Sequence, residues 1–70
     1  MSFVVMRVEH DAVEGTLPRF LLGEVNGAYS WGLQHALAAN YEARKDATRE
    51  CAKAVLTYAG CGFDFSVVEV

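Results

Sequence analysis

Apolar and polar residues alternate along the first segment of the chain. In the stretch FVVMRVEH, residues 3–10, this alternation places Val4, Met6 and Val8 on one face of a strand and Phe3 and Val5 on the other. The same alternation, together with many β-branched or aromatic residues, predicts two more full strands over residues 19–25 and 63–69. It also predicts one short strand over residues 28–31.

A tight turn joins two of these strands. Asn26 and Gly27 form the pair most favoured in a two-residue type I′ hairpin, because both central residues of that turn need a positive φ. In the hairpin register that follows, Leu22 lies opposite Trp31. One face of the hairpin then gathers four large side chains: Phe20, Leu22, Tyr29 and Trp31.

The segment between residues 33 and 59 has helical composition, in two apolar stripes that are out of phase. One stripe runs from Leu33 to Tyr41 and the other from Ala47 to Tyr58. The six residues from Tyr41 to Ala47 turn a helix by about 240°, so one straight helix cannot bury both stripes. Gly60 occupies the position that favours a left-handed helix cap. We therefore predict a helical turn, a break and a main helix, over residues 34–40, 41–43 and 44–59.

These elements predict a single α+β domain over residues 1–70. Its antiparallel sheet has three or four strands, the order along the chain is β-β-β-α-β, and the helix packs on one face. An antiparallel sheet can leave its other face to water or to a partner. We expect an interface on an apolar patch of that face, formed by Phe3, Val5, Leu21 and Val25. Tyr29 and Trp31 are expected to add partly exposed anchors at the hairpin end.

Composition favours self-association. The chain has 70 residues, 53% of them hydrophobic, and a domain of this size buries only about 60% of its unfolded surface. Because the sequence shows no disulfide framework or metal site that would stabilise so small a domain, we expect a homodimer; a tightly packed monomer is the alternative. Cys51 and Cys61 are expected to be free thiols. Ten residues of helix rise about 15 Å, whereas a disulfide needs Cα atoms within roughly 7 Å.

Charge and hydropathy exclude several classes of function. The net charge of −3 argues against nucleic-acid binding without sequence preference, which needs a basic surface. The first ten residues lack the basic and apolar regions of a signal peptide. No apolar run approaches the about 20 residues that span a bilayer. We therefore expect a cytoplasmic protein that has no membrane segment and binds a protein partner.

A basic stripe on the main helix offers an alternative. It contains four of the six positively charged residues of the chain: Arg44, Lys45, Arg49 and Lys53. This stripe would suit an acidic partner or a phosphate backbone, as in an accessory protein associated with nucleic acid. Glu42, Asp46 and Glu50 each precede one of these basic residues by three positions, so we favour a solvated face with ion pairs.

No residue pattern indicates catalysis, a metal or a cofactor. His10, His35 and the two cysteines lack the paired spacing of a metal site. Cys61 follows a helix C-terminus, whose partial negative charge disfavours a thiolate. The acidic residues around His10 cluster in a loop with no evident pocket. We therefore predict a protein without enzymatic activity and without catalytic, metal-binding or cofactor-binding residues.

One arrangement resembles a known group of proteins. A predicted hairpin is followed by a helix and by a final strand that ends in VVEV. From the end of the hairpin to the start of the helix, the resemblance rests on five residues: Trp31, Ala38, Tyr41, Arg44 and Ala47. Over residues 19–70 this resembles small phage- and prophage-encoded proteins of hairpin–helix–strand type, some of which are anti-CRISPR inhibitors. Those chains often carry Ser or Thr where this chain has Ala43. The resemblance implies a binding protein that occludes a surface of a host protein; a homodimeric structural protein is the other alternative.

Overall fold

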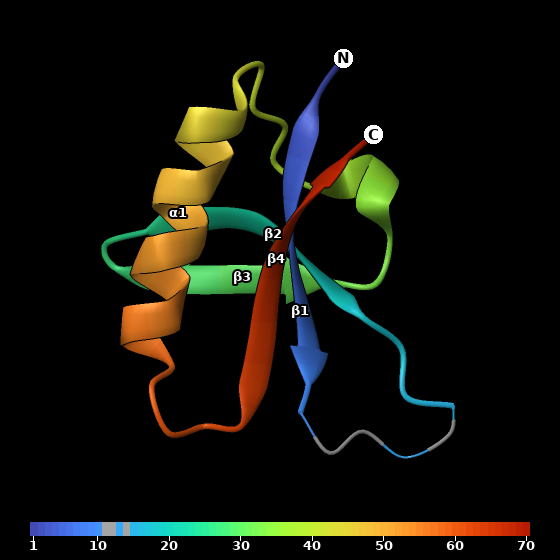
Figure 1. Ribbon diagram of the computed structural model, residues 1–70, viewed down its shortest axis with the longest axis vertical. Coiled ribbons are helices and arrows are strands. Elements are labelled where there is room, and N and C mark those ends of the chain that lie inside the picture. Colours follow the sequence, from blue (N-terminus) through green and yellow to red (C-terminus); the bar gives the residue numbers. More distant parts are fainter. Residues whose placement is uncertain (11–12, 14) are drawn as a thin grey trace.

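The computed structural model describes residues 1–10, 13 and 15–70, which form an antiparallel sheet and one main helix. The strands lie side by side in the order β3-β2-β1-β4 (Figure 1). The elements are β1 (Phe3–Glu9), β2 (Arg19–Val25), β3 (Ala28–Gly32), a short 3-10 turn η1 (His35–Leu37), α1 (Arg44–Thr57) and β4 (Phe63–Glu69). The α+β class and the β-β-β-α-β order are confirmed.

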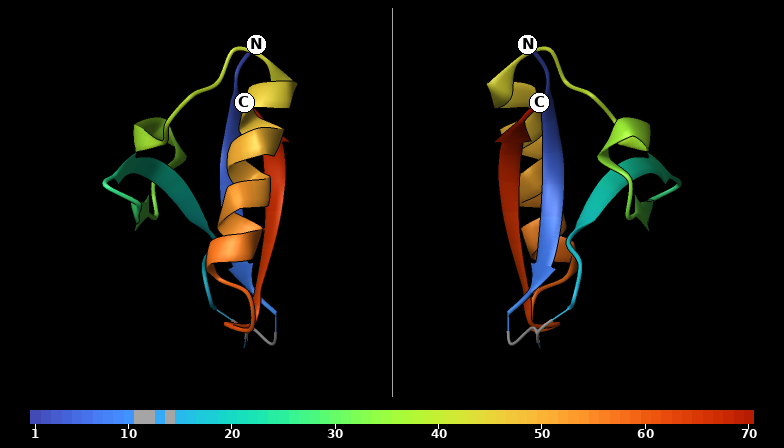
Figure 2. Two further views of the ribbon diagram at one scale, coloured as in Figure 1. Left: turned by 90° about the vertical axis from the view of Figure 1, so that its left-hand side faces the viewer. Right: turned by 90° about the vertical axis from the view of Figure 1, so that its right-hand side faces the viewer.

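Helix α1 packs on one face of the β1–β4 pair (Figure 2). Its contact stripe consists of small residues: Ala47 and Ala54 are fully buried and Cys51 is half-buried. Their spacing of four and three residues keeps them on one side of the helix. Val55, which the sequence places in the same stripe, is exposed instead. Short side chains at the contact let the helix lie close against the strands.

The predicted break before the main helix is confirmed. The backbone of Tyr41 exchanges two hydrogen bonds of 2.9 Å with the backbone of Phe3, so Tyr41 forms an isolated antiparallel bridge beside the start of β1. The preceding helical turn is only three residues long, and Leu33 and Leu37 are exposed, so the first apolar stripe is not buried. Helix α1 ends at Thr57, two residues before the predicted end, with Tyr58 as its C-cap; Gly60, with a φ of 83°, lies in the turn that follows.

The start of α1 lacks a side-chain cap. Ala43 is the N-cap residue, with extended backbone (φ −111°, ψ 135°) and no side chain that can accept a hydrogen bond. Replacing it by Ser or Asp provides an acceptor for the free N–H groups of the first turn. We expect Ala43→Ser to raise the free energy of unfolding by about 1 kcal/mol. Urea unfolding followed by circular dichroism measures this; Ala43→Val, which also enlarges the side chain but cannot cap, should give no gain.

The β2–β3 hairpin has the predicted turn, and its first pairs, Val25 with Ala28 and Glu24 with Tyr29, are those of the predicted register. Asn26 and Gly27 both have positive φ, 52° and 82°, as a type I′ turn requires. Further along the strands, a bulge between Leu21 and Gly23 inserts one residue. Trp31 therefore lies opposite Leu21, and the prediction that Leu22 shares its face is wrong. A one-residue shift moves a side chain to the opposite face of a strand, and local alternation cannot reveal it.

The apolar patch predicted on the outer face does not exist. Val5 is 0% exposed and Leu21 is 1% exposed, so neither reaches the surface. Arg7, two positions after Val5 and on the same face of β1, stacks on Tyr58 just beyond α1. The odd-numbered residues of β1 thus point toward the helix layer, so the helix covers the face that we predicted to be left to water or to a partner.

The opposite face of β1 is also partly covered. Val4 is completely buried on the side away from α1. On this side lie η1 and the extended residues that follow it (Figure 1). Ala39 donates its N–H to the carbonyl oxygen of Leu21 at 2.9 Å, which ties this segment to β2. The hairpin runs crosswise to β1 and β4, so the sheet is strongly twisted (Figures 1 and 2).

Candidate interaction surfaces

Among the residues that the structure describes, β4 pairs with β1 alone and forms one edge of the sheet. Ser2 and Val70 exchange two backbone hydrogen bonds, of 3.3 and 2.8 Å, at the end of this ladder. In an antiparallel pair such bonded positions recur at every second residue. Even-numbered residues of β4 therefore bond to β1, and the N–H and C=O groups of the odd-numbered ones point outward. These outward residues are Phe63, Phe65, Val67 and Glu69.

The side chains along this edge do little to protect it. Natural edge strands are often blocked by Pro, by Lys or by a bulge. β4 has none of these: its sequence is FDFSVVE, and its seven residues pair in continuous register with β1. Its only charges are those of Asp64 and Glu69. The edge is thus open to a further strand.

A cluster of aromatic rings fills the space between the hairpin, β4 and the end of α1. Trp31 donates its indole N–H to the Tyr58 hydroxyl at 3.0 Å. The cluster also contains Tyr29, Phe63 and Phe65. The centroid of each of these rings lies 5.8–6.4 Å from the centroid of a neighbouring ring, and all three residues are half-buried. Tyr29 and Trp31 thus join the hairpin to the rest of the fold, and their role as anchors for a partner stays a prediction.

The Arg7 side chain packs against this cluster. Its guanidinium carbon lies 4.2 Å from the centroid of Phe63 and 4.8 Å from that of Trp31. Sequence reasoning missed this residue, because a lone arginine in an alternating strand gives no signal of what its side chain meets. Only the pairing of β1 with both β4 and β2, and of β2 with β3, brings these three residues together.

Most of the basic stripe on α1 is engaged within the chain. Arg49 pairs with Asp46 at 3.7 Å and Lys53 with Glu50 at 3.2 Å, as two of the three predicted pairs. Arg44 lies over the ring of Phe3, with its guanidinium carbon 4.9 Å from the centroid. Lys45 is exposed. The stripe therefore forms the solvated, ion-paired face that the sequence favours.

The residues of the predicted interface do not meet in one surface. Val5 and Leu21 are buried, and Phe3 is half-buried beneath Arg44. Val25 is 71% exposed, near the tip of the hairpin. The four basic residues lie on α1. No single partner surface follows from this set.

The residues considered for chemistry are dispersed. His10 contacts Asp64 at 3.0 Å, both exposed, whereas His35 packs edge-on against Phe20 with centroids 6.0 Å apart. Over residues 1–10, 13 and 15–70, no group of three or more His, Cys, Asp or Glu side chains is placed to hold a metal ion. Of the loop acids considered, Asp11 and Glu14 lie outside the described residues.

The two cysteines are free thiols in different environments. Burial raises the pKa of the Cys51 thiol, which lies on the sheet-facing side of α1, and Cys61 is exposed. A raised pKa lowers the thiolate fraction at pH 7–8, and the thiolate is the reactive form. We expect a disulfide reagent to modify Cys61 quickly and Cys51 at least about tenfold more slowly. Absorbance during the reaction measures both phases, and Cys61→Ser should abolish only the fast one.

In the part of the chain that the structure describes, no helix combines the length and apolar composition required to cross a bilayer. Comparison of the chain with protein-family models, with curated proteins and with solved structures found no match.

Proposed function

We propose that the protein is a small non-enzymatic interaction module that binds an extended strand along β4. The outward row of backbone N–H and C=O groups on this edge supports the proposal. Added strands bind such rows through main-chain hydrogen bonds, and neighbouring side chains provide specificity. We propose that the added strand is β4 of a second copy of the chain.

A second copy fits this edge without conflict of charge. In antiparallel pairing about a two-fold axis at Ser66, Phe65 faces Val67 of the second copy and Phe63 faces Glu69 of the second copy. Asp64 faces Val68 of the second copy. No pair places two like charges opposite each other, which would destabilise the ladder. The contact is isologous, so it closes as a dimer and cannot extend into a fibre.

The dimer also agrees with the composition of the chain. A hydrophobic content of 53% is high for a chain of 70 residues, which can bury only a limited share of its surface, so the composition favours self-association. We infer that the dimer works in the cytoplasm, where its cysteines stay reduced. It would act by occluding a surface of another protein, as the resemblance to phage-encoded inhibitors implies. The nucleic-acid alternative is less favoured because Arg49 and Lys53 are ion-paired.

The test removes outward N–H groups from β4. In the variant Val67→Pro/Glu69→Pro, proline deletes two donors that face away from β1, a location where strands tolerate proline. The matched control, Val67→Ala/Glu69→Ala, loses the same side chains and keeps both donors. By light scattering, the wild type and the alanine control should have twice the chain mass of 7.7 kDa, and the proline variant the monomer mass.

A second variant keeps the test decisive if the proline variant does not fold. Ser66 is exposed, and Ser66→Lys places two positive charges together at the dimer axis. We expect a folded monomer at low salt and partial recovery of the dimer at high salt, which screens the repulsion. Ser66→Asn should remain dimeric. A wild-type protein that stays monomeric at high concentration would contradict the proposal. So would a control variant, Ser66→Asn or Val67→Ala/Glu69→Ala, that dissociates as fully as the variant it is matched to.

A further inference from the structure

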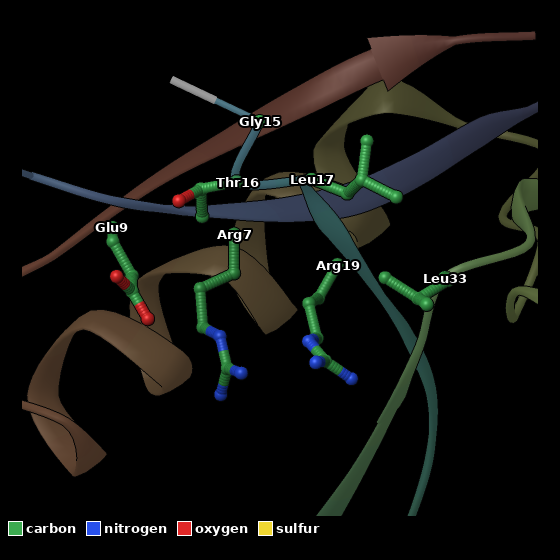
Figure 3. A pocket seen from close by; sticks show the side chains of 7 residues that line it. All are labelled: Arg7, Glu9, Gly15, Thr16, Leu17, Arg19 and Leu33. Carbon is green, nitrogen blue, oxygen red and sulfur yellow. The ribbon is translucent and has the colours of Figure 1, made fainter. Parts of the chain in front are cut away.

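A pocket of about 290 Å³ opens between the end of β1 and the start of β2 (Figure 3). Its wall combines two arginines and the carboxylate of Glu9 with a hydroxyl group and apolar side chains. The lining residues are Arg7, Glu9, Gly15, Thr16, Leu17, Arg19 and Leu33. None of these residues belongs to the predicted interface, and none belongs to β4.

The two arginines face each other across paired strands. Arg7 and Arg19 are direct partners in the antiparallel register of β1 and β2, so they share one face of the sheet. Figure 3 shows both side chains extending in the same direction, with Glu9 on the far side of Arg7 from Arg19. Like charges directly opposite in a sheet are destabilising. The other four positive residues of this acidic chain lie on α1, so the pair is a local concentration of positive charge.

The guanidinium group of Arg7 is held in place by aromatic rings. Phe63, Trp31 and Tyr58 have centroids 4.2, 4.8 and 5.9 Å from its central carbon. Such contacts fix the planar group while its N–H donors stay available at its edges. Among the described residues, neither Arg7 nor Arg19 takes part in an ion pair or a side-chain hydrogen bond.

We propose that Arg7 and Arg19 bind the dianionic phosphate group of a small organic phosphate. Two guanidinium forks supply two positive charges and bidentate donors, which match a dianion with three terminal oxygens. A carboxylate carries a single negative charge and pairs with one guanidinium group, so it matches the two arginines less well than a phosphate dianion does. The hydroxyl of Thr16 adds a polar group to the wall, and Leu17 and Leu33 provide apolar surface for the organic part. Because the aromatic rings already hold the Arg7 side chain in place, less side-chain conformational entropy is lost when the phosphate binds.

The experiment is a titration of ¹⁵N-labelled protein with phenyl phosphate and with inorganic phosphate, followed by NMR at constant ionic strength and pH 7.5. We expect saturable shifts at the Nε–H groups of Arg7 and Arg19 and at the amides of Gly15 to Leu17. Phenyl phosphate should bind more tightly than inorganic phosphate because of the leucines. At pH 5 the affinity should fall several-fold, because the second phosphate pKa is near 6 and the monoanion then dominates.

Matched charge variants identify the site. Arg19 is exposed, so Arg19→Gln should leave the fold intact and weaken phenyl phosphate binding at least about tenfold. Arg49→Gln removes the same charge from the outside of α1 and should leave the affinity unchanged. Shifts that do not saturate, or equal weakening in both variants, would overturn the site. Benzoate binding as tightly as phenyl phosphate, with no loss at pH 5, would overturn its assignment to phosphate.

Discussion

Leu21→Asp is expected to unfold the protein. Leu21 is 1% exposed, so the substitution removes a buried leucine and places a carboxylate among apolar atoms. Losing the leucine side chain alone costs about 2–5 kcal/mol, and burying a polar group without a partner adds more. At roughly 0.05–0.15 kcal/mol per residue, a chain of 70 residues has a total stability of about 3.5–10 kcal/mol. Circular dichroism at 25 °C should show loss of the native spectrum.

Val25→Asp is the matched control for this substitution. Both residues belong to β2, and sequence patterning assigns both to one exposed apolar face. Val25 is 71% exposed, so its replacement should change the free energy of unfolding by less than about 0.5 kcal/mol. If both residues belonged to a surface patch, both variants would remain folded. A folded Leu21→Asp protein would therefore show that Leu21 does not belong to the core.

Trp31→Ala should cause the second largest loss of stability. The indole ring contacts Phe65, Tyr58 and Tyr29, donates a hydrogen bond to the Tyr58 hydroxyl, and supports Arg7. Truncating a large aromatic residue costs about 3–5 kcal/mol when it is fully buried, and Trp31 is half-buried. We expect about 3 kcal/mol, a drop in Tm of about 12–24 °C for a domain of this size. Thermal unfolding followed by circular dichroism measures the change.

Trp31→Phe separates packing from hydrogen bonding. Phenylalanine retains most of the ring contacts but cannot donate to the Tyr58 hydroxyl. Losing one hydrogen bond in a partly buried setting costs about 1 kcal/mol. The phenylalanine variant should therefore lie between the wild type and the alanine variant. An alanine variant as stable as the phenylalanine variant would mean that the aromatic cluster does not join the hairpin to α1 and β4.

The two proposed sites can be tested separately. The β4 edge depends on backbone groups of its odd-numbered residues, whereas the pocket depends on the side chains of Arg7 and Arg19. Ser66→Lys changes neither arginine, and Arg19→Gln changes no residue of β4. A monomeric Ser66→Lys protein that still binds phenyl phosphate would show that the pocket is complete within one chain.

Local patterns in the sequence determined the elements of this fold. Alternation and β-branched residues predicted the strands, Asn26 and Gly27 the hairpin turn, and Gly60 the end of α1 to within two residues. Each signal acts within a few residues, through backbone conformation or side-chain period. The ion pairs on α1 were predictable for the same reason, because their partners are one helical turn apart.

Tertiary structure alone decided which face of each strand is buried. Both faces of β1 are apolar at its start, so alternation could not tell whether α1 covers Val4 or Val5. One bulge reversed the positions of Leu21 and Leu22, because a shift of one residue moves a side chain to the other face.

The candidate sites depend on the same long-range pairing. The β4 edge exists because β4 ends the strand order, and the pocket because Arg7 lies opposite Arg19. The segments that carry these arginines are joined by a loop, and neither segment specifies the register between them. The sequence by itself thus determined the elements and the charged face of the helix. The pairing of distant strands determined the buried face, the open edge and the arginine pair, because each is set by contacts between segments far apart in the chain.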